Sequence, residues 1–164
     1  MKQQSATIII ATVLSFFNAT AAPEKPVKDN TVKVSVTASF NRIVVRDNVD
    51  VVLVEMPSQD VSIKGKARQC EDVKLEVKEG VLTIASRRPS AMKQAVVYVP
   101  VQQIESITVK GYSNVTSAGS LRSARLHIKI EGECRVNVIN SGPVTVSNGP
   151  DHGYDYELQQ KINL

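Results

Sequence analysis

Two segments, twenty-one residues apart, share almost the same pattern and constrain the fold more than any other part of the sequence. Ile107–Val115 reads Ile-Thr-Val-Lys-Gly-Tyr-Ser-Asn-Val, and Ile128–Val136 reads Ile-Lys-Ile-Glu-Gly-Glu-Cys-Arg-Val. In each copy an alternating strand stops at a glycine, three polar or small residues follow, and a strand restarts on valine. The repeat predicts strands joined by tight corners, and it contains no catalytic group.

The two-residue period of a β-strand recurs from residue 32 to residue 146. The segments that show it are Val32–Val36, Ile43–Val45, Val49–Val54, Val61–Ile63, Val73–Val77, Val81–Ala85, Ala95–Val99, Ile107–Val109, Leu126–Ile130, Val136–Val138 and Val144–Val146. Glu79-Gly80, between two of them, predicts a hairpin. About two dozen valines supply β-branched side chains, which pack well on a pleated sheet. The chain is therefore predicted to be all-β.

Two architectures fit a dozen short strands. A β-helix-like solenoid would stack the strands in layers, and the twenty-one-residue repeat favours it. A β-sandwich would pair them as antiparallel hairpins, and Glu79-Gly80 favours that arrangement. The solenoid is the first expectation and the sandwich is the alternative.

The N-terminus has the pattern of an export signal. Lys2 gives a basic start, Ile8–Phe17 is apolar but too short for the roughly 20 residues that span a bilayer, and Ala19-Thr20-Ala21 suits signal peptidase. We expect a signal peptide over 1–21, a flexible leader over 22–31, one β domain over 32–149 and a C-terminal tail over 150–164. The mature protein is expected to be periplasmic, secreted or on the cell surface, with no transmembrane segment after cleavage.

The charge balance is mildly basic. The formal net charge is +4, and it becomes +3 once the signal segment with its single lysine is removed. Lys64, Lys66 and Arg68 form a basic cluster that could bind an envelope glycan or lipopolysaccharide. Acidic residues such as Glu71 and Asp72 lie close by in the sequence, which is also the pattern of an ordinary solvated face. No nucleic acid partner is expected.

Several stretches together resemble the head GIN domain family of auto-transporter adhesins. They are Phe40–Leu53, Val73–Ile84, Val96–Pro100 and Ile107–Gly111, with the Val-Asp-Val step at Val49 and the Gly-Val-Leu-Thr-Ile step at Gly80 the most telling. The resemblance implies an exported bacterial domain with a β-helix-like stack of strands and an adhesive role, and it implies no catalytic residue. The family's usual Ser-Gly-Ser-Gly corners are replaced here by bulkier ones.

The two cysteines bear on the architecture. An exported protein enters an oxidising compartment, where Cys70 and Cys134 can form one disulfide. They lie 64 residues apart, about three repeats, and three strand spacings amount to roughly 14 Å. A disulfide needs Cα atoms within about 7 Å. A regular solenoid therefore predicts two thiols, and a bridge would favour a fold that doubles back.

The few candidate catalytic and metal-binding residues are isolated. His127 and Lys129 are expected on the exposed side of a strand, without an acidic partner inside that strand. His152, with Asp151 and Asp155, reads as a polar turn, because metal sites need three or four converging ligands. No Gly-x-Ser-x-Gly motif of a serine hydrolase occurs. Neither a metal nor another cofactor is expected.

Tyrosines are the remaining candidates for a binding surface. Tyr112 lies in the first corner, where its ring could either face a sugar or a peptide or pack over the neighbouring corner. Tyr154 and Tyr156 lie near the C-terminus and could act in the same way. The sequence thus predicts a non-enzymatic, adhesin-like binding or structural module of the bacterial cell envelope. Its partner is an unspecified glycan, lipopolysaccharide or protein. The alternative is a polysaccharide-active β-helix enzyme.

Overall fold

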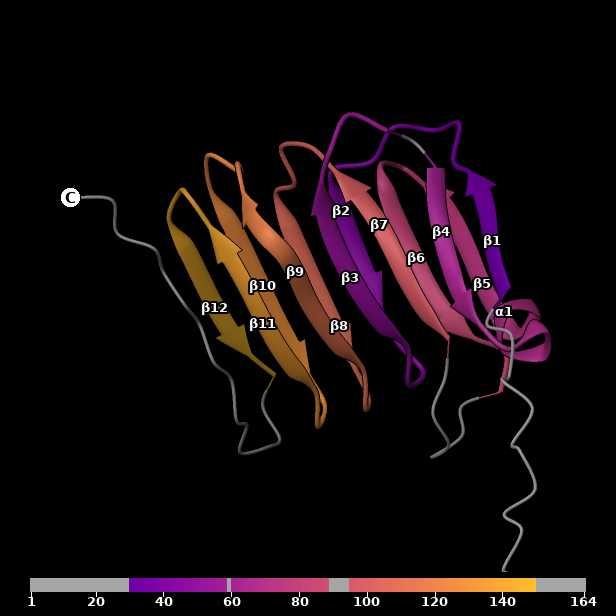
Figure 1. Ribbon diagram of the computed structural model, residues 1–164. Helices are drawn as coiled ribbons and strands as arrows, with labels where there is room; N and C mark the ends of the chain where they lie inside the picture. Colours follow the sequence, from indigo (N-terminus) through magenta and orange to yellow (C-terminus); the bar gives the residue numbers. More distant parts are fainter. Residues whose placement is uncertain (1–29, 59, 89–94, 150–164) are drawn as a thin grey trace, which may run out of the picture.

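The computed structural model describes residues 30–58, 60–88 and 95–149, which form two sheets of six strands each (Figure 1). Sheet A contains, in spatial order, β1 (Asn30–Ser35), β4 (Asp60–Gly65), β7 (Val96–Val101), β3 (Asp50–Glu55), β9 (Asn114–Leu121) and β11 (Arg135–Asn140). Sheet B contains β12 (Val144–Asn148), β10 (Leu126–Glu131), β8 (Ser106–Lys110), β2 (Arg42–Val45), β6 (Val81–Ser86) and β5 (Val73–Lys78). The prediction of an all-β fold is confirmed.

One aliphatic core fills the space between the sheets. Alternate residues of most strands are buried, such as Val51 and Leu53 on sheet A and Ile128 and Ile130 on sheet B. Burying a side chain of this size contributes about 1.5–3 kcal/mol relative to leaving it exposed. The core contains no tryptophan, so its stability depends on many valines, isoleucines and leucines.

Parallel pairing dominates the part of the fold that contains the repeat. In sheet B, His127 of β10 is opposite Ser106 of β8, and in sheet A, Arg135 of β11 is opposite Asn114 of β9. Both pairs are twenty-one residues apart, so the sequence repeat is the step from one strand to its parallel neighbour. Antiparallel pairs join β1 to β4, β4 to β7 and β5 to β6.

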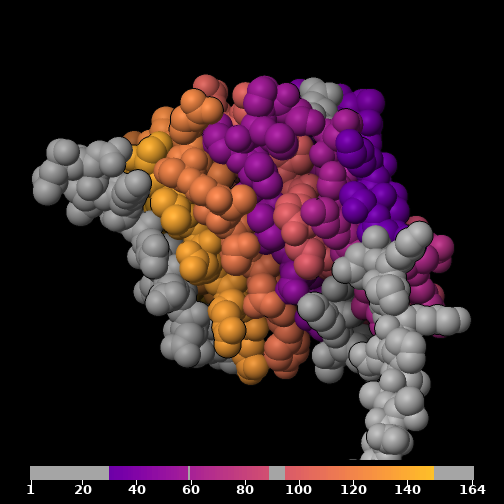
Figure 2. Space-filling view, viewed as in Figure 1, coloured from indigo at the N-terminus to yellow at the C-terminus, as the bar shows by residue number. Residues whose placement is uncertain are grey.

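The earliest strands of the repeat-like part, β2 and β3, lie in the middle of their sheets. β2 pairs with β6 on one side and β8 on the other, and β3 pairs with β7 and β9. Figure 2 shows the resulting order of colours, with indigo β1 at one end of the molecule and yellow β12 towards the other. The segment from β4 to β7 is thus built on one side of β2 and β3, and the segment from β8 to β12 on the other side.

The predicted hairpin is confirmed. β5 and β6 pair antiparallel from Val73 opposite Ser86 to Lys78 opposite Val81. The two connecting residues have positive φ, 52° at Glu79 and 73° at Gly80. This is the conformation of the tight turns whose twist matches the flanking strands.

Three boundaries differ from the sequence-based expectation. β1 begins at Asn30, two residues inside the segment predicted as a leader. A short helix, α1 (Ala67–Asp72), joins β4 to β5, and six residues are too few to show a helical period. β9 runs on to Leu121 through Ser117–Ser120, a stretch with no alternation, because a bulge against β11 interrupts the register there. The predicted signal peptide and C-terminal tail lie outside the described residues.

Candidate binding surface

The repeated corners lie at the same end of successive strands and form a column there. Gly111 and Gly132 have φ of 71° and 140°. Asp47, at the corner between β2 and β3, has φ of 64° and occupies the same position, because its neighbours are in register with those of Gly111. Aspartate is one of the few residues other than glycine that enter this region readily. The sequence repeat therefore has a third copy, whose corner residue Asp47 lies 64 residues before Gly111 and takes the place of the glycine.

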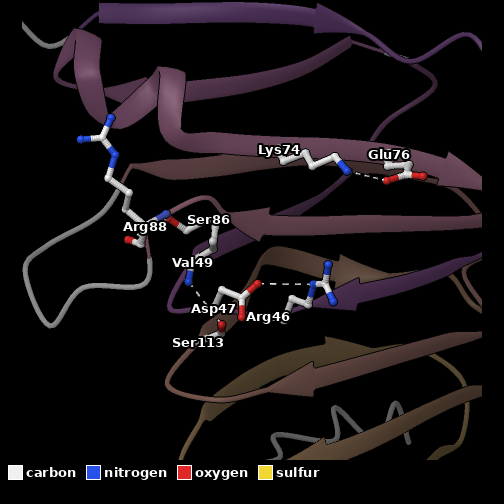
Figure 3. Close-up of polar contacts among 8 residues, drawn as sticks. All are labelled: Arg46, Asp47, Val49, Lys74, Glu76, Ser86, Arg88 and Ser113. Carbon is white, nitrogen blue, oxygen red and sulfur yellow. Dashed lines mark hydrogen bonds and ion pairs between the residues drawn. The ribbon is translucent and has the colours of Figure 1, made fainter.

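The inner side of each corner is closed by a small buried side chain. The N–H of Val49 donates a hydrogen bond of 3.2 Å to Oγ of Ser113, which is fully buried (Figure 3). Cys134 takes the place of Ser113 in the next corner, and its thiol lies 3.5 Å from the carbonyl oxygen of Gly132. The bond from Val49 to Ser113 joins two neighbouring corners, whereas the contact of Cys134 with Gly132 lies within one corner.

A second buried polar group, Asn140, joins β11 to the loop before β10. Its side chain is 1% exposed, and Oδ1 accepts a hydrogen bond of 3.1 Å from the N–H of Ser123. Nδ2 donates to the carbonyl oxygens of Ser123 at 3.0 Å and of Gly142 at 3.1 Å. The amide thus pairs with three backbone groups of residues that lie between strands.

Tyr112 follows Gly111 in its corner and is 65% exposed. Of the two placements considered from the sequence, the structure has the exposed one. It is one of three exposed large apolar side chains among the described residues, with Val32 and Met56. Tyr154, Tyr156 and the turn with His152 lie outside the described residues.

The predicted basic cluster lies where β4 runs into α1. Lys64 is on the outer face of sheet A, with its Nζ 4.6 Å from the centre of the Tyr98 ring. Lys66 is the N-cap residue of α1, and Arg68 is an exposed residue of that helix. All three are accessible, but only Lys64 belongs to a sheet face, and it is partly engaged by the tyrosine.

The disulfide considered from the sequence does not form. Cys70 and Cys134 are both buried thiols. The Sγ of Cys70 lies 3.8 Å from the carbonyl oxygen of Ile63 on β4, while Cys134 immediately precedes β11. β4 and β11 are four strand spacings apart in sheet A, about 19 Å, which is far beyond the reach of a disulfide.

We expect both thiols to react slowly with iodoacetamide in the folded protein. Cys70 is 5% exposed and Cys134 is 7% exposed, and burial raises the pKa of Cys134, so little thiolate forms near neutral pH. After denaturation without a reductant, mass spectrometry should find two alkyl groups per chain. Alkylation only after reduction would show that a bridge forms and would contradict the structure.

A basic face covers the outside of sheet B. It consists of six exposed residues that the strands bring together: Arg42, Arg46, Lys74, Lys78, Lys110 and Lys129. Only two carboxylates, Glu76 and Glu131, lie at outward strand positions of the same face, and Asp47 is at its edge beside Arg46 (Figure 3). The sequence did not reveal this face, because its members come from four strands whose order in the sheet had to be known.

The carboxylate of Glu131 bridges two of these lysines. Its Oε2 is 2.6 Å from Nζ of Lys110, and its Oε1 is 2.5 Å from Nζ of Lys129. The hydrogen bond from Lys110, followed by that from Lys129, holds the pKa of Glu131 below its ordinary value. The expectation that His127 and Lys129 have no acidic partner in their strand is therefore wrong, because β10 extends to Glu131. His127 itself is exposed, as predicted, with Nε2 3.0 Å from Oγ of Ser147.

Acid should weaken the native state partly through Glu131. Because its folded-state pKa is lowered, the unfolded chain takes up the proton first, and the associated stability is lost as the pH falls below about 4.5. Between neutral pH and pH 3 the urea concentration at the midpoint of unfolding should fall less for Glu131→Gln than for the wild type. Glu133→Gln, in the exposed corner that follows, should keep the pH dependence of the wild type; equal profiles for all three proteins would exclude a role for Glu131.

Two hollows of the described part are lined by few basic side chains, and one of them adjoins the basic face at Glu76. One, of about 240 Å³, is lined by Val34–Ala38 and Leu75–Val77, at the end of the molecule where β1 and β5 are the edge strands. Another, of about 540 Å³, is lined by Glu55, Gln102, Gln103 and Arg122. Within residues 30–58, 60–88 and 95–149, no three His, Cys, Asp or Glu side chains converge as metal ligands would, and no helix is long and apolar enough to cross a membrane.

Comparison with known proteins identifies a family. A family model described as "putative auto-transporter adhesin, head GIN domain" matches residues 39–149. That span contains every described strand except β1. No curated protein matches the sequence.

Several solved structures share the fold. A "putative adhesin" from Bacteroides fragilis NCTC 9343 has a TM-score of 0.52 and 17% identity, with 73% of this chain and 61% of that one covered. A "putative adhesin" from Parabacteroides distasonis ATCC 8503 has a TM-score of 0.51 and 20% identity, with 80% and 70% covered. A third, from Parabacteroides merdae ATCC 43184, has a TM-score of 0.50 and 15% identity, with 73% and 56% covered. The chain thus spans only part of the length of each.

Proposed function

The chain belongs to the head GIN domain family, and from this membership we propose that it is an exported, non-enzymatic binding module of the bacterial cell envelope. The observation that carries the proposal is the match to an adhesin family over residues 39–149, nearly the whole of the described β structure. Three similar structures from bacteria are also described as adhesins, which supports the same class.

Export is proposed from the N-terminal sequence. The basic start, the apolar run and Ala19-Thr20-Ala21 support removal of residues 1–21 by signal peptidase. Residues 22–29 would then be a short leader, and residues 150–164 a C-terminal tail. The mature domain would be periplasmic, secreted or at the cell surface.

The parallel part of the fold is proposed to be a short two-sided solenoid. In support, β8 and β10 pair in sheet B, and β9 and β11 pair in sheet A, both at a step of twenty-one residues. The corner residues Asp47, Gly111 and Gly132 all have positive φ. Stacked repeats present extended surfaces that suit extended ligands.

A polysaccharide-cleaving enzyme is the alternative class, and one experiment separates the two. Purified protein is immobilised and exposed to isolated envelope polysaccharide, lipopolysaccharide and peptidoglycan, and released reducing ends are measured in parallel. We expect retention of at least one fraction without new reducing ends. Cleavage would show that the protein is an enzyme, and retention of no fraction would contradict a binding role.

A further inference from the structure

The two outer faces of the molecule differ in charge. Sheet B carries the six residues of the basic face against Glu76, Glu131 and, at the edge beside Arg46, Asp47, which leaves an excess of three positive charges. The outward positions of sheet A carry three basic residues, Lys33, Lys64 and Arg135, against two acidic ones, Asp50 and Asp60. The centre of sheet A is instead apolar, with half-buried side chains such as Val52 and Tyr98. The positive field of the protein is therefore directed mainly from sheet B.

The registers of sheet B place its outward side chains in rows across the strands. One row runs from Glu76 on β5 through Thr83, Val44 and Thr108 to Lys129 on β10. Strands in a sheet are about 4.8 Å apart, so six strands make a surface about 24 Å wide. A linear polymer lying across the strands would meet one side chain from each strand in turn.

Positive charges lie next to hydroxyl groups at several points of these rows, which also contain Glu76, Val44 and Val81. Arg42 is opposite Ser106 and, through it, His127. Lys129 is opposite Thr108 on one side and Ser147 on the other. Ammonium, guanidinium and hydroxyl groups are the donors that bind carboxylate and hydroxyl oxygens.

We propose that the basic face binds an extended acidic polysaccharide of the polyuronate type, lying across the strands of sheet B. The proposal rests on the proposed function as a binding module and assigns its ligand class and its surface. The carboxylates of the polymer would meet the spread positive charges, and the hydroxyl groups of its sugars would meet the serines and threonines between them.

The shape of the face argues against other anionic ligands. A small anion would need an enclosed group of donors. The hollow that adjoins the basic face at Glu76 has no lysine or arginine in its lining, and the other hollow is not lined by sheet B. A membrane surface would call for exposed aromatic or large apolar side chains beside the charges. Of the three exposed ones, Val32 is on β1 and Met56 follows β3, both of sheet A, and only Tyr112, in the corner after Lys110, lies near the charges.

The test compares two triple variants with the same change in charge. Arg42→Gln/Lys78→Gln/Lys129→Gln alters the basic face, and Lys33→Gln/Lys64→Gln/Arg135→Gln alters the opposite face. Binding to polygalacturonate is measured by calorimetry at low ionic strength, with neutral dextran as the uncharged control. We expect the Kd of the first variant to rise about tenfold or more and that of the second to change less than about threefold. Equal losses would overturn the proposal.

A third variant should bind more tightly. Glu131→Gln removes the carboxylate that holds Lys110 and Lys129, so the Kd for polygalacturonate should fall by about two- to threefold. Thermal unfolding of each variant confirms that it is folded. Unchanged or weaker binding by Glu131→Gln would overturn the proposal, as would a preference for vesicles of anionic phospholipid over polygalacturonate.

The outcomes separate this inference from the proposed function. If the wild type retains a neutral envelope glycan but not polygalacturonate, the ligand class is wrong and the binding module stands. If it retains none of the envelope fractions and none of the polymers, the proposed function fails as well.

Discussion

Gly132→Ala is expected to lower the free energy of unfolding by about 3–5 kcal/mol, because two penalties combine at that corner. A Cβ at residue 132 would lie 2.5 Å from the backbone nitrogen of Gly111 and 2.6 Å from its carbonyl oxygen. These are backbone atoms, so no side-chain rotation can relieve the contact. The φ of 140° adds strain for any residue with a side chain.

Gly119→Ala is the matched control. It makes the same chemical change in β9, where a new Cβ would have no heavy atom within 4 Å. Since the unfolded chain also loses freedom, its effect should lie within about 1 kcal/mol of the wild type in either direction. Urea unfolding followed by far-UV circular dichroism measures both variants. A Gly132→Ala protein as stable as Gly119→Ala would show that the two corners are not packed in this way.

Asn140→Ala is expected to lower the free energy of unfolding by about 3 kcal/mol. The truncation leaves the N–H and carbonyl oxygen of Ser123 and the carbonyl oxygen of Gly142 without the amide that bonds to them. Leaving a buried backbone group unsatisfied costs about 1–3 kcal/mol, and partial access of water to the loop offsets some of the total.

Asn137→Ala on the same strand provides the comparison. Asn137 is exposed on the outer face of β11, so its removal should change stability by no more than about 0.5 kcal/mol. Both variants are followed by urea unfolding, and the difference between them isolates the buried amide. If both variants lower the free energy of unfolding by the same amount, the hydrogen bonds of Asn140 do not contribute to stability.

The strands could be predicted from the sequence because inward and outward residues alternate wherever one face is buried. All eleven segments with a two-residue period overlap a strand, and the Glu79-Gly80 hairpin has the expected turn. β9 was recognised only at its start, because Ser117–Ser120 forms a bulge in which small residues replace the period. α1 could not be predicted, since six residues show no helical pattern.

The third corner was missed for two physical reasons. Aspartate adopts the left-handed conformation without the glycine that marked the other copies, so Asp47 gave no signal. The interval of 64 residues to Gly111 also includes β4 to β7, which hides the regular step.

The candidate surface was harder to predict from the sequence than the fold. Lys64, Lys66 and Arg68 were proposed because they are close in sequence, yet the larger group of positive charges comes from β2, β5, β8 and β10. Which strands are neighbours depends on the sheet order, and nothing local in the sequence encodes that β2 pairs with both β6 and β8. Tyr112 was correctly considered for exposure because corners project beyond the sheets.

The central position of β2 and β3 has a consequence for the order in which the protein can fold. As the chain is made from its N-terminus, these strands appear early, but β6 and β7 follow only from residue 81 and β8 and β9 only from residue 106. Until then both strands have unpaired edges, which are the usual starting points of aggregation. Pairing across such sequence separations also slows folding. A chain held unfolded until synthesis is complete would avoid this interval.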